Sequence, residues 1–297
     1  MSNSVSASFL RLDTVDQAAL QGKYERLQSI IRDLGSAAVA FSGGVDSTLL
    51  LKVAHDVLGD RCIAVVAVSE SYTPEEADTA RELAALIGAE CVFIETSELA
   101  DERFASNPAN RCYYCKQELF SKMSAVAGER GIAWLLYGAN YDDRGDFRPG
   151  SAAAAEANAR APLQEAGLTK AEIRELSRRL GLPTWSRPAS ACLASRVPYG
   201  TRITAEVLNR IASAERVLRH LGFTQLRVRH HDQIARIEVP IDEFPKVIEE
   251  HTRRQIVERL KDIGYVYVTL DLQGFRSGSM NEALGRAAVS SGAGEKR

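Results

Sequence analysis

A short run of glycines, serines and an aspartate is the first feature of this chain that could support chemistry. The run is Ser-Gly-Gly-Val-Asp-Ser at residues 42–47, between an apolar segment and a segment with helical spacing. Glycines let the backbone approach an anion closely, and amides at the start of a helix point toward phosphate. Ser42 and Ser47 add hydroxyl donors, and Asp46 has the oxygen ligands that Mg²⁺ prefers. The run therefore predicts a phosphate-binding loop.

This loop differs from the two best-known nucleotide loops. No Gly-Lys-Ser or Gly-Lys-Thr follows, as in a Walker loop, and the Gly-x-Gly-x-x-Gly dinucleotide fingerprint is absent from it. The alternative is an ordinary glycine-containing turn between a strand and a helix. Both serines and the aspartate, in a strand–loop–helix context, favour nucleotide binding.

Three cysteines form the second feature. Cys112 and Cys115 have Cys-x-x-Cys spacing in Arg-Cys-Tyr-Tyr-Cys-Lys, at the start of a predicted helix, and Cys192 lies in a proline-containing loop. Thiolate is the reactive form of cysteine, and nearby cations favour it. Three cations flank these cysteines and are expected to lower their pKa: Arg111, Lys116 and Arg196.

Three interpretations of these thiols are open. They are unrelated thiols, or ligands of a structural zinc, or thiolates that bind an iron–sulfur cluster or transfer sulfur. A structural zinc needs a fourth ligand, and no histidine lies near either motif. Three cysteine ligands would leave one iron of a [4Fe-4S] cluster open, and we favour this third interpretation. Cys62 and Cys91 lie in apolar segments and are expected to be small core residues.

The elements around these motifs alternate between strand and helix. Apolar strands are predicted at residues 37–41, 62–68, 91–94 and 134–137, and helices near 20–31, 48–58, 74–87 and 114–130. Strands that are apolar throughout and alternate with helices indicate a doubly wound α/β fold, with a parallel sheet covered on both faces. Ligands of such sheets bind at the carboxyl ends of the strands. The polar segment 140–150 is predicted to be a loop at this edge.

A second unit is predicted after a long loop. Thr169 and Glu172 form a capping box that starts a helix, and residues 184–201 are predicted to be a loop. The remaining predicted elements are a helix from 204 to 221, strands at 225–230 and 234–239, one amphipathic helix at 242–263 and a strand at 265–272. We expect a first domain at residues 15–203, a smaller αββαβ domain at 204–287, and flexible tails at 1–14 and 288–297.

Charged residues of the second unit suggest an anion site. Arg227 and Arg229 alternate along a predicted strand, so both face one side, which suits bidentate binding of a phosphate. The alternative is two solvated strand arginines. Glu215 and Glu238 are candidates to hold a metal or orient these arginines, against the default of surface carboxylates.

Composition limits the partners. The chain has 297 residues, a net charge of −2 and a pI of about 6.3, which argues against non-specific nucleic-acid binding. We see no signal peptide and no apolar run long enough for a membrane span. The five cysteines are an odd number in a chain of this size, and in a reducing compartment they point to metal or catalytic use rather than a disulfide framework. We therefore expect a cytoplasmic protein, a homo-oligomer, with neither membrane nor nucleic acid as a partner.

The nucleotide loop resembles that of the PP-loop ATP pyrophosphatases, which cleave ATP to AMP and pyrophosphate. Members adenylate a carboxyl or carbonyl oxygen and then displace AMP, a good leaving group, with a nucleophile. The resemblance implies that ATP is the cofactor and that Mg²⁺ is held by Asp46. The residues implied to bind ATP are Ser42, Gly43, Gly44, Asp46 and Ser47.

Further motifs resemble the LarE-type ATP-dependent sulfur transferases of nickel-pincer nucleotide synthesis. These motifs are Arg-Cys-Tyr-Tyr-Cys-Lys, Gly-Ala-Asn-Tyr-Asp-Asp at 138–143, Arg-Pro-Gly at 148–150, Cys-Leu-Ala-Ser-Arg at 192–196, and the strand segments 226–229 and 235–239. The resemblance covers residues 24–281. It implies that both carboxylates of a pyridinium-dicarboxylate mononucleotide, a small-molecule substrate, are adenylated and converted to thiocarboxylates. Implied substrate ligands are Ser195, Arg196, Arg227, Arg229 and Arg276, with Glu238 as a possible metal ligand.

The resemblance leaves the route of sulfur open. Some members sacrifice the sulfur of the cysteine that matches Cys192, whereas members with all three cysteines resemble carriers of a [4Fe-4S] cluster with an extra sulfide. Because Cys112, Cys115 and Cys192 are all present, we favour the cluster. Rival functions are a PP-loop tRNA thiolase, an ammonia-dependent amidating ligase such as NAD synthetase, and a non-catalytic nucleotide sensor.

Overall fold

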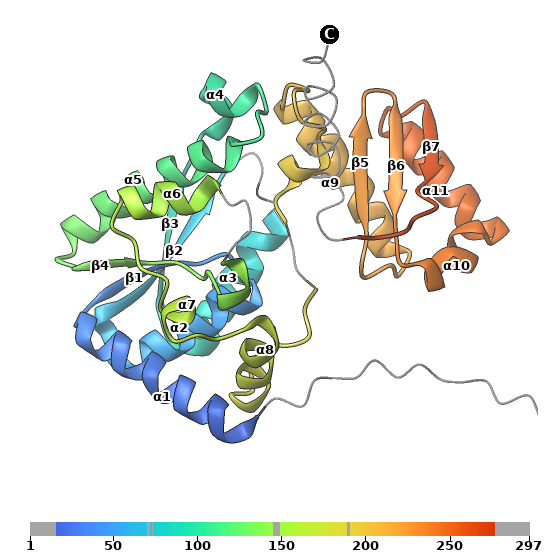
Figure 1. The fold of residues 1–297 in the computed structure, drawn as a ribbon. Helices are drawn as coiled ribbons and strands as arrows, with labels where there is room; N and C mark the ends of the chain where they lie inside the picture. The colour runs from blue at the N-terminus through green and yellow to red at the C-terminus, as the bar shows by residue number, and fades with distance from the viewer. Residues whose placement is uncertain (1–15, 70–71, 73, 145–148, 189–190, 277–297) are drawn as a thin grey trace, which may run out of the picture.

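The computed structural model describes residues 16–69, 72, 74–144, 149–188 and 191–276 (Figure 1). The predicted tails, residues 1–14 and 288–297, lie outside the described residues. So do Arg148 of the Arg-Pro-Gly motif and residues 277–281 at the end of the resemblance.

The first sheet is parallel, as predicted. Its order is β3 (Glu90–Glu95), β2 (Cys62–Val68), β1 (Ala37–Ala40) and β4 (Trp134–Leu136), and every neighbouring pair runs parallel. Along β1, Ala37 and Val39 join one hydrophobic core, and Ala38 joins another. The apolar strands are therefore buried on both faces.

Helices on either side of this sheet supply the two cores (Figure 1). One side carries α1 (Gln17–Leu34), α2 (Val45–Leu58), α3 (Pro74–Ile87), α7 (Pro162–Glu165) and α8 (Lys170–Arg179). The other carries α5 (Arg111–Glu129) and α6 (Pro149–Glu156), while the short α4 (Glu102–Ala105) precedes α5. This arrangement confirms the predicted α/β class.

A second, three-stranded sheet lies near the C-terminal end. Its order is β5 (Arg227–His231), β6 (Ile234–Glu238) and β7 (Tyr267–Leu270), antiparallel between β5 and β6 and parallel between β6 and β7. Its core is formed with α9 (Ala205–His220), α10 (Phe244–Ile248) and α11 (Glu250–Asp262). Val228 and Ile237 belong to that core, so their neighbours along the strands face the opposite side.

Two predicted elements were wrong in detail. The helix expected at 242–263 is divided at Glu249, whose backbone is extended (ψ 135°) and whose carboxylate accepts hydrogen bonds from the amides of His251 and Thr252. Glu249 thus caps α11, although the apolar spacing continues across the break. Part of the loop expected at 140–150 is instead helical, because α6 begins at Pro149.

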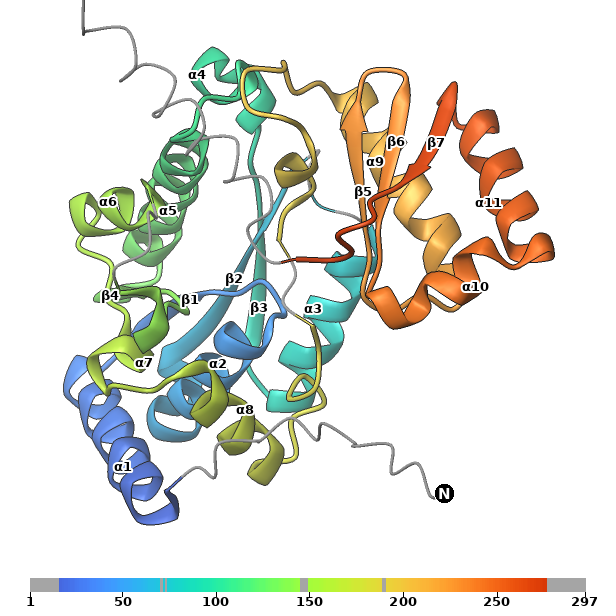
Figure 2. The ribbon, with the colours of Figure 1, turned by 45° about the vertical axis from the view of Figure 1, so that its right-hand side comes forward.

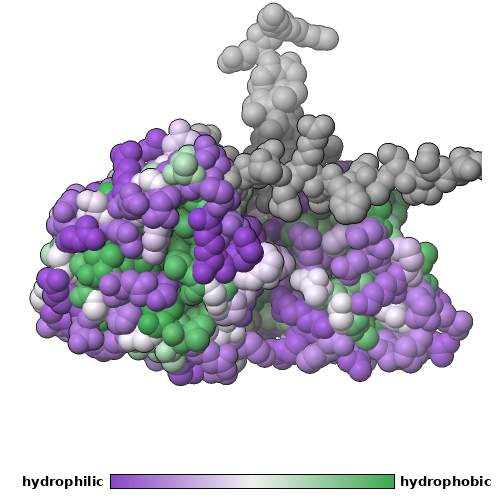
Figure 3. All heavy atoms as spheres, turned by 90° about the horizontal axis from the view of Figure 1, so that it is seen from below, coloured by the Kyte–Doolittle hydropathy of each residue, from purple (hydrophilic) through white to green (hydrophobic). Residues whose placement is uncertain are grey.

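The segment between the two sheets has its own hydrophobic contacts. Residues 191–203 run between the sheets (Figure 2), and Leu193, Val197 and Ile203 pack with Phe104 and with Ile211 of α9. This hydrophobic cluster contains residues from both sides of position 203. The domain boundary expected near residue 203 therefore stays a prediction. No helix in the described ranges is long and apolar enough to cross a membrane, and hydrophilic residues are spread over the face in Figure 3.

Candidate active site

The predicted nucleotide loop connects β1 to α2. Gly43 has a φ of 68°, a conformation that favours glycine, and Gly44 is the residue before the first turn of α2. The Ser47 hydroxyl donates to the Gly44 carbonyl (3.2 Å) and accepts from the Ser42 amide (3.3 Å). These hydrogen bonds hold the loop at the N-terminus of α2, a helix of 14 residues. Backbone amides at this position can bind phosphate.

The loop after β4 packs directly on this nucleotide loop. A Cβ added at Gly138 would lie 3.0 Å from the Ser47 nitrogen, which is closer than side chains normally pack. Gly138 therefore allows two backbones to meet at the carboxyl edge of the sheet. Two residues further on, Asn140 starts a short 3₁₀ turn, Tyr141–Asp143, with a capping box to Asp143.

Asp46 has one paired and one unpaired carboxylate oxygen. Oδ2 forms a salt bridge with the Lys170 ammonium. Oδ1 is buried and has no hydrogen-bond partner among the described residues. A buried carboxylate oxygen without a donor is uncommon and is the type of ligand that Mg²⁺ prefers. The residues at this position therefore fit a magnesium ion.

Lys170 was not among the site residues predicted from the sequence. The capping box of Thr169 and Glu172 forms as predicted and sets the start of α8, and Lys170 is the first residue of that helix. A lysine in the first turn of a helix near a sheet's active edge was the available signal. Its partner could not be recognised because Asp46 lies 124 residues earlier.

The predicted cysteines come from two segments that pack together. Cys112 and Cys115 lie near the start of α5, as expected; Cys112 is exposed and Cys115 is partly buried. Leu193, the residue after the exposed Cys192, shares a hydrophobic cluster with Cys115. The thiols of Cys192 and Cys112 are also close enough to raise the pKa of Cys115. The three thiols therefore lie in one region.

The expected lowering of thiol pKa by flanking cations is wrong for Cys115. Burial raises its pKa well above the ordinary value, and the Glu98 carboxylate raises it further, whereas Lys116 lowers it only in part. The Cys115 thiol donates a hydrogen bond to Glu98 Oε1 at 3.7 Å. In this environment the protonated form of Cys115 is favoured.

The thiols fit an iron–sulfur cluster in donor type and neighbourhood. Among the described residues, however, no group of three or more histidine, cysteine or acidic side chains is close enough to hold a metal ion. Ligation of a cluster by Cys112, Cys115 and Cys192 therefore requires the side chains to move together, and it stays a proposal.

Asn107 holds the Cys192 segment against the helix of Cys112 and Cys115. Its Nδ2 donates to carbonyls of residues 197, 198 and 201, and its Oδ1 accepts from the Arg111 guanidinium (2.9 Å). Arg111 also stacks over the ring of Tyr199 at 4.7 Å. Asn107 is fully buried and has a φ of 58°. Its role was not visible in the sequence because the carbonyls that it binds lie about 90 residues downstream.

We expect Asn107→Ala to lower the free energy of unfolding by about 2–3 kcal/mol, because it leaves buried carbonyls and Arg111 without their partner. Asn158→Ala is the matched control. Asn158 has a similar φ of 52° but is exposed, so its loss changes backbone preference without these bonds. Urea denaturation of both variants measures the difference. Equal destabilisation would show that backbone preference, and not the Asn107 side chain, is responsible.

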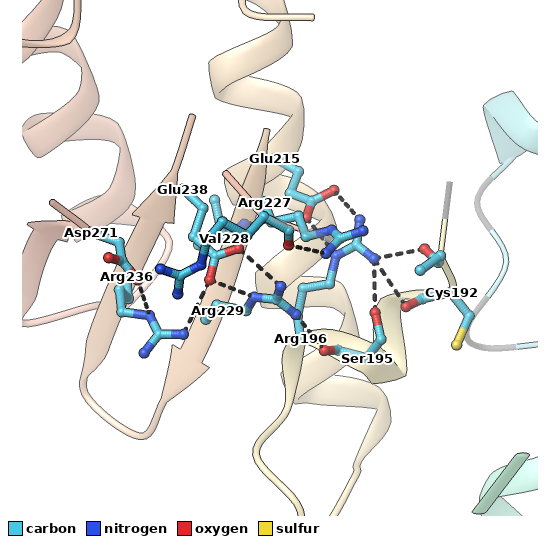
Figure 4. Close-up of polar contacts among 12 residues, drawn as sticks. Cys192, Ser195, Arg196, Glu215, Arg227, Val228, Arg229, Arg236, Glu238 and Asp271 are labelled. Carbon is cyan, nitrogen blue, oxygen red and sulfur yellow. Dashed lines mark hydrogen bonds and ion pairs between the residues drawn. The ribbon is translucent and has the colours of Figure 1, made fainter. Parts of the chain in front are cut away.

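Arg196 holds the backbone of the Cys192 loop in place through hydrogen bonds (Figure 4). Its guanidinium is buried, binds the Glu215 carboxylate at 2.8 and 3.3 Å, and donates to the carbonyls of Ala191 and Cys192 and to the Ser195 hydroxyl. Burial would lower the pKa of Arg196, but Glu215 raises it above the ordinary value. Arg196 is thus a fixed cation beneath the loop.

Arg229 and Glu238 are buried, not solvated or at the surface. Arg229 is 1% exposed, binds both oxygens of Glu238 at 3.0 and 2.9 Å, and donates to the Ser195 carbonyl at 2.7 Å. Glu238 also accepts from Arg236. In this arrangement the Arg229 guanidinium positions the Ser195 loop and is already engaged with a carboxylate.

Arg227 lies close to Arg229 and Arg196 (Figure 4). It donates to the Arg276 carbonyl at 3.3 Å and stacks on the ring of Phe275. Burial lowers its pKa to about 10, and the charges of Arg229 and Arg196 contribute. Three guanidiniums with two buried carboxylates, Glu215 and Glu238, leave a local excess of positive charge. Such a group would be stabilised by an anion.

Comparison with known proteins identifies relatives of nearly full length, although no family model matches the chain. The chain is 44% identical over 276 residues to the pyridinium-3,5-bisthiocarboxylic acid mononucleotide synthase of Lactiplantibacillus plantarum, covering 92% of this chain and 98% of that protein. It is 43% identical over 265 residues to an uncharacterized protein of Synechocystis sp., covering 89% and 99%.

A more distant similarity covers about half of the chain. A subunit of the glutamine-hydrolysing GMP synthase of Archaeoglobus fulgidus is 27% identical over 176 residues, which are 55% of this chain and 56% of that protein. The near-complete match to the synthase of Lactiplantibacillus confirms the LarE-type resemblance. This chain belongs to the family of the pyridinium-3,5-bisthiocarboxylic acid mononucleotide synthase.

Proposed function

We propose that this protein is an ATP-dependent sulfur transferase that converts the carboxylates of a pyridinium-dicarboxylate mononucleotide to thiocarboxylates. The observation that carries the proposal is the 44% identity, over 98% of its length, to a synthase named for a bisthiocarboxylic acid mononucleotide. The nucleotide loop and the neighbouring thiols supply the two types of group that this reaction needs.

The first half-reaction activates a carboxylate. The loop amides and the hydroxyls of Ser42 and Ser47 would bind phosphate oxygens, and Asp46 would hold Mg²⁺, which would neutralise phosphate charge. A substrate carboxylate oxygen attacks the α-phosphorus, the bond to the β-phosphate breaks, and pyrophosphate leaves. The carboxyl carbon is now an acyl adenylate, whose leaving group is AMP.

The second half-reaction introduces sulfur. A sulfur nucleophile forms a bond to the acyl carbon, the bond from carbon to the AMP oxygen breaks, and a thiocarboxylate remains after release. In the sacrificial route the nucleophile is the Cys192 thiolate, and cleavage of its Cβ–S bond with loss of the α-proton leaves dehydroalanine. In the route that we favour, Cys112, Cys115 and Cys192 would hold a [4Fe-4S] cluster, which supplies an iron able to bind sulfide.

We propose that three neighbouring arginines, Arg196, Arg227 and Arg229, form the binding site of the substrate phosphate. Arg227 would be the principal ligand, because Arg229 is paired with Glu238 and Arg196 with Glu215. Ser195 and Arg276 lie beside these arginines and are proposed to complete the substrate site. Glu238 would orient Arg229, or bind a metal if Arg229 moves to the phosphate.

We expect Arg227→Ala to raise the apparent KM for the nucleotide substrate at least about tenfold, because a charge-assisted bond contributes about 1.5–3 kcal/mol. The KM for ATP should change little. Arg219→Ala is the control: Arg219 also pairs with Glu215, but its side chain is 53% exposed. Steady-state kinetics with each substrate varied in turn measure the effect. An unchanged KM for the nucleotide substrate in Arg227→Ala would refute the phosphate assignment.

Analysis of the nucleotide products tests the proposed function against its rivals. MgATP with the carboxylated pyridinium mononucleotide should give AMP and pyrophosphate; ADP and orthophosphate would contradict it. Turnover that requires tRNA would favour the tRNA thiolase. Formation of an amide with ammonium would favour the amidating ligase, the function class nearest to the distant GMP synthase similarity. A cytoplasmic location and a homo-oligomeric state stay predictions of the sequence.

A further inference from the structure

We propose that Glu98 is the fourth protein ligand of the iron–sulfur cluster: its buried Oε2 binds the iron that Cys112, Cys115 and Cys192 leave open. The inference rests on the cluster that we favour under the proposed function and adds a carboxylate to its ligands. Iron accepts carboxylate oxygen as well as thiolate. When sulfide binds, the bond from the Glu98 oxygen to iron breaks and a bond from hydrosulfide sulfur to iron forms, with no change in oxidation state.

The Glu98 carboxylate is buried, and only one of its oxygens has hydrogen-bond partners. Glu98 is 6% exposed, and Oε1 accepts from the Thr96 hydroxyl at 3.2 Å and from the Cys115 thiol at 3.7 Å. Oε2 is also buried and has no hydrogen-bond partner among the described residues. A buried carboxylate oxygen without a partner is costly, and a bound cation would remove that cost. Glu98 therefore has an oxygen available for a metal beside one of the proposed cluster ligands.

The backbone around Glu98 is held between the first sheet and the helix of the cysteines. The Thr96 amide donates to the Val68 carbonyl at the end of β2 at 2.9 Å, and the Ser97 amide donates to Glu118 Oε1 of α5 at 2.9 Å. A 3₁₀ turn begins directly afterwards, at Glu98. Because α5 also carries two of the three cysteines, these contacts place the Glu98 carboxylate beside them.

Cys115 is the common neighbour of the four proposed ligands. Burial is the main cause that raises the pKa of its thiol, and the charges of Glu98, Cys192 and Cys112 add to it, so these three groups lie near Cys115. No three of the described histidine, cysteine and acidic side chains are close enough to share one metal ion. A four-iron cluster distributes its ligands over different irons, so its donor atoms stand further apart than those around a single ion. The arrangement therefore suits a cluster better than a single metal ion.

The alternative role of Glu98 is to orient the Cys115 thiol through its hydrogen bond alone. Glutamine in place of Glu98 separates the two roles. Its amide oxygen still accepts hydrogen bonds from Thr96 and Cys115, but the side chain has no charge and is a weak ligand of iron. Glu98→Gln therefore keeps the orienting contact and removes the proposed ligand.

Sulfide titration of the anaerobically reconstituted protein, followed by the electron paramagnetic resonance spectrum of the reduced cluster, measures this exchange. We expect Glu98→Gln to bind sulfide at least about tenfold more tightly than the wild type, because a carboxylate that occupies the iron for about nine-tenths of the time lowers the apparent affinity by that factor. The iron content per chain should be unchanged. Glu118→Gln is the matched control: Glu118 holds the same segment through the Ser97 amide, and its side chain is 25% exposed, so this variant should bind sulfide like the wild type.

Mössbauer spectroscopy of the wild type gives a second measurement that needs no variant. One iron should change its signal when sulfide is added, and Glu98→Gln without sulfide should change the signal of the same iron.

Equal sulfide affinity and an unchanged Mössbauer signal in Glu98→Gln would overturn the ligand role and leave the cluster and the proposed function intact. Equal loss of iron from Glu98→Gln and Glu118→Gln would overturn it too, and would assign Glu98 to holding the segment. A wild type that binds no iron yet forms the thiocarboxylate would overturn the cluster and the ligand role but not the proposed function. An iron-loaded wild type that shows the exchange but forms no thiocarboxylate would support the ligand role and contradict the proposed function.

Discussion

Asp46→Ala should remove detectable formation of AMP and pyrophosphate, a fall of at least about a thousandfold, because this change removes the proposed ligand of Mg²⁺, the ion that would neutralise phosphate charge. The melting temperature should stay close to that of the wild type. Asp46 lies in the first turn of α2, and its partly exposed pair with Lys170 contributes at most about 1 kcal/mol. The measurement is pyrophosphate release under saturating MgATP, with thermal unfolding of the same samples.

Asp56→Ala is the matched control for this prediction. Asp56 lies on the same helix, α2, and is paired with Lys52 by a similar partly exposed ion pair at 2.6 Å. It should retain wild-type activity and a similar melting temperature. Normal pyrophosphate release in Asp46→Ala would remove Asp46 from the mechanism, and with it the magnesium site proposed at its buried oxygen.

Cys192→Ala should separate the two half-reactions. We expect this variant to form AMP and pyrophosphate, because the nucleotide loop is intact, but to yield no thiocarboxylate, because either route of sulfur passes through Cys192. Cys91→Ala, which removes a half-buried thiol from the edge strand β3, should form the thiocarboxylate normally. Thiocarboxylate formed by Cys192→Ala at the wild-type rate would exclude both routes.

The same set of variants distinguishes the cluster from sacrifice of the cysteine. If Cys112, Cys115 and Cys192 jointly hold a cluster, anaerobic reconstitution gives iron and sulfide in the wild type, and Cys→Ala at any of the three removes both. Supplied sulfide should then allow several products per chain. Absence of iron, one sulfur transferred per chain and conversion of Cys192 to dehydroalanine would instead establish the sacrificial route.

Local elements of the fold were predictable because their signals are local. The apolar runs of β1 and β2, the bounds of α3 and the capping box at Thr169 all follow from residues within one element. The strand–loop–helix position of Ser42 to Ser47 was predictable for the same reason. Glu249 was not: its carboxylate competes for amides of the next turn, and the apolar spacing on both sides hides the break.

The surroundings of the site depended on long-range packing. Strand alternation placed Arg227 and Arg229 on one face, but it could not reveal that this face closes on Ser195 or that Glu238 neutralises Arg229. Likewise, the cations beside Cys115 were visible in sequence, whereas its burial and the approach of Glu98 were not. Lys170 was overlooked because its chemistry depends on Asp46, which only the folded sheet brings near.

The most direct test of the central claim is the mass of the pyridinium product. The protein should be incubated anaerobically with MgATP, sulfide and the pyridinium-dicarboxylate mononucleotide, and the product analysed by high-resolution mass spectrometry together with AMP. We expect sulfur to replace carboxylate oxygen, with one AMP formed for each replacement. AMP formed with an unchanged or amidated pyridinium nucleotide, or a sulfur-containing product without AMP, would contradict it.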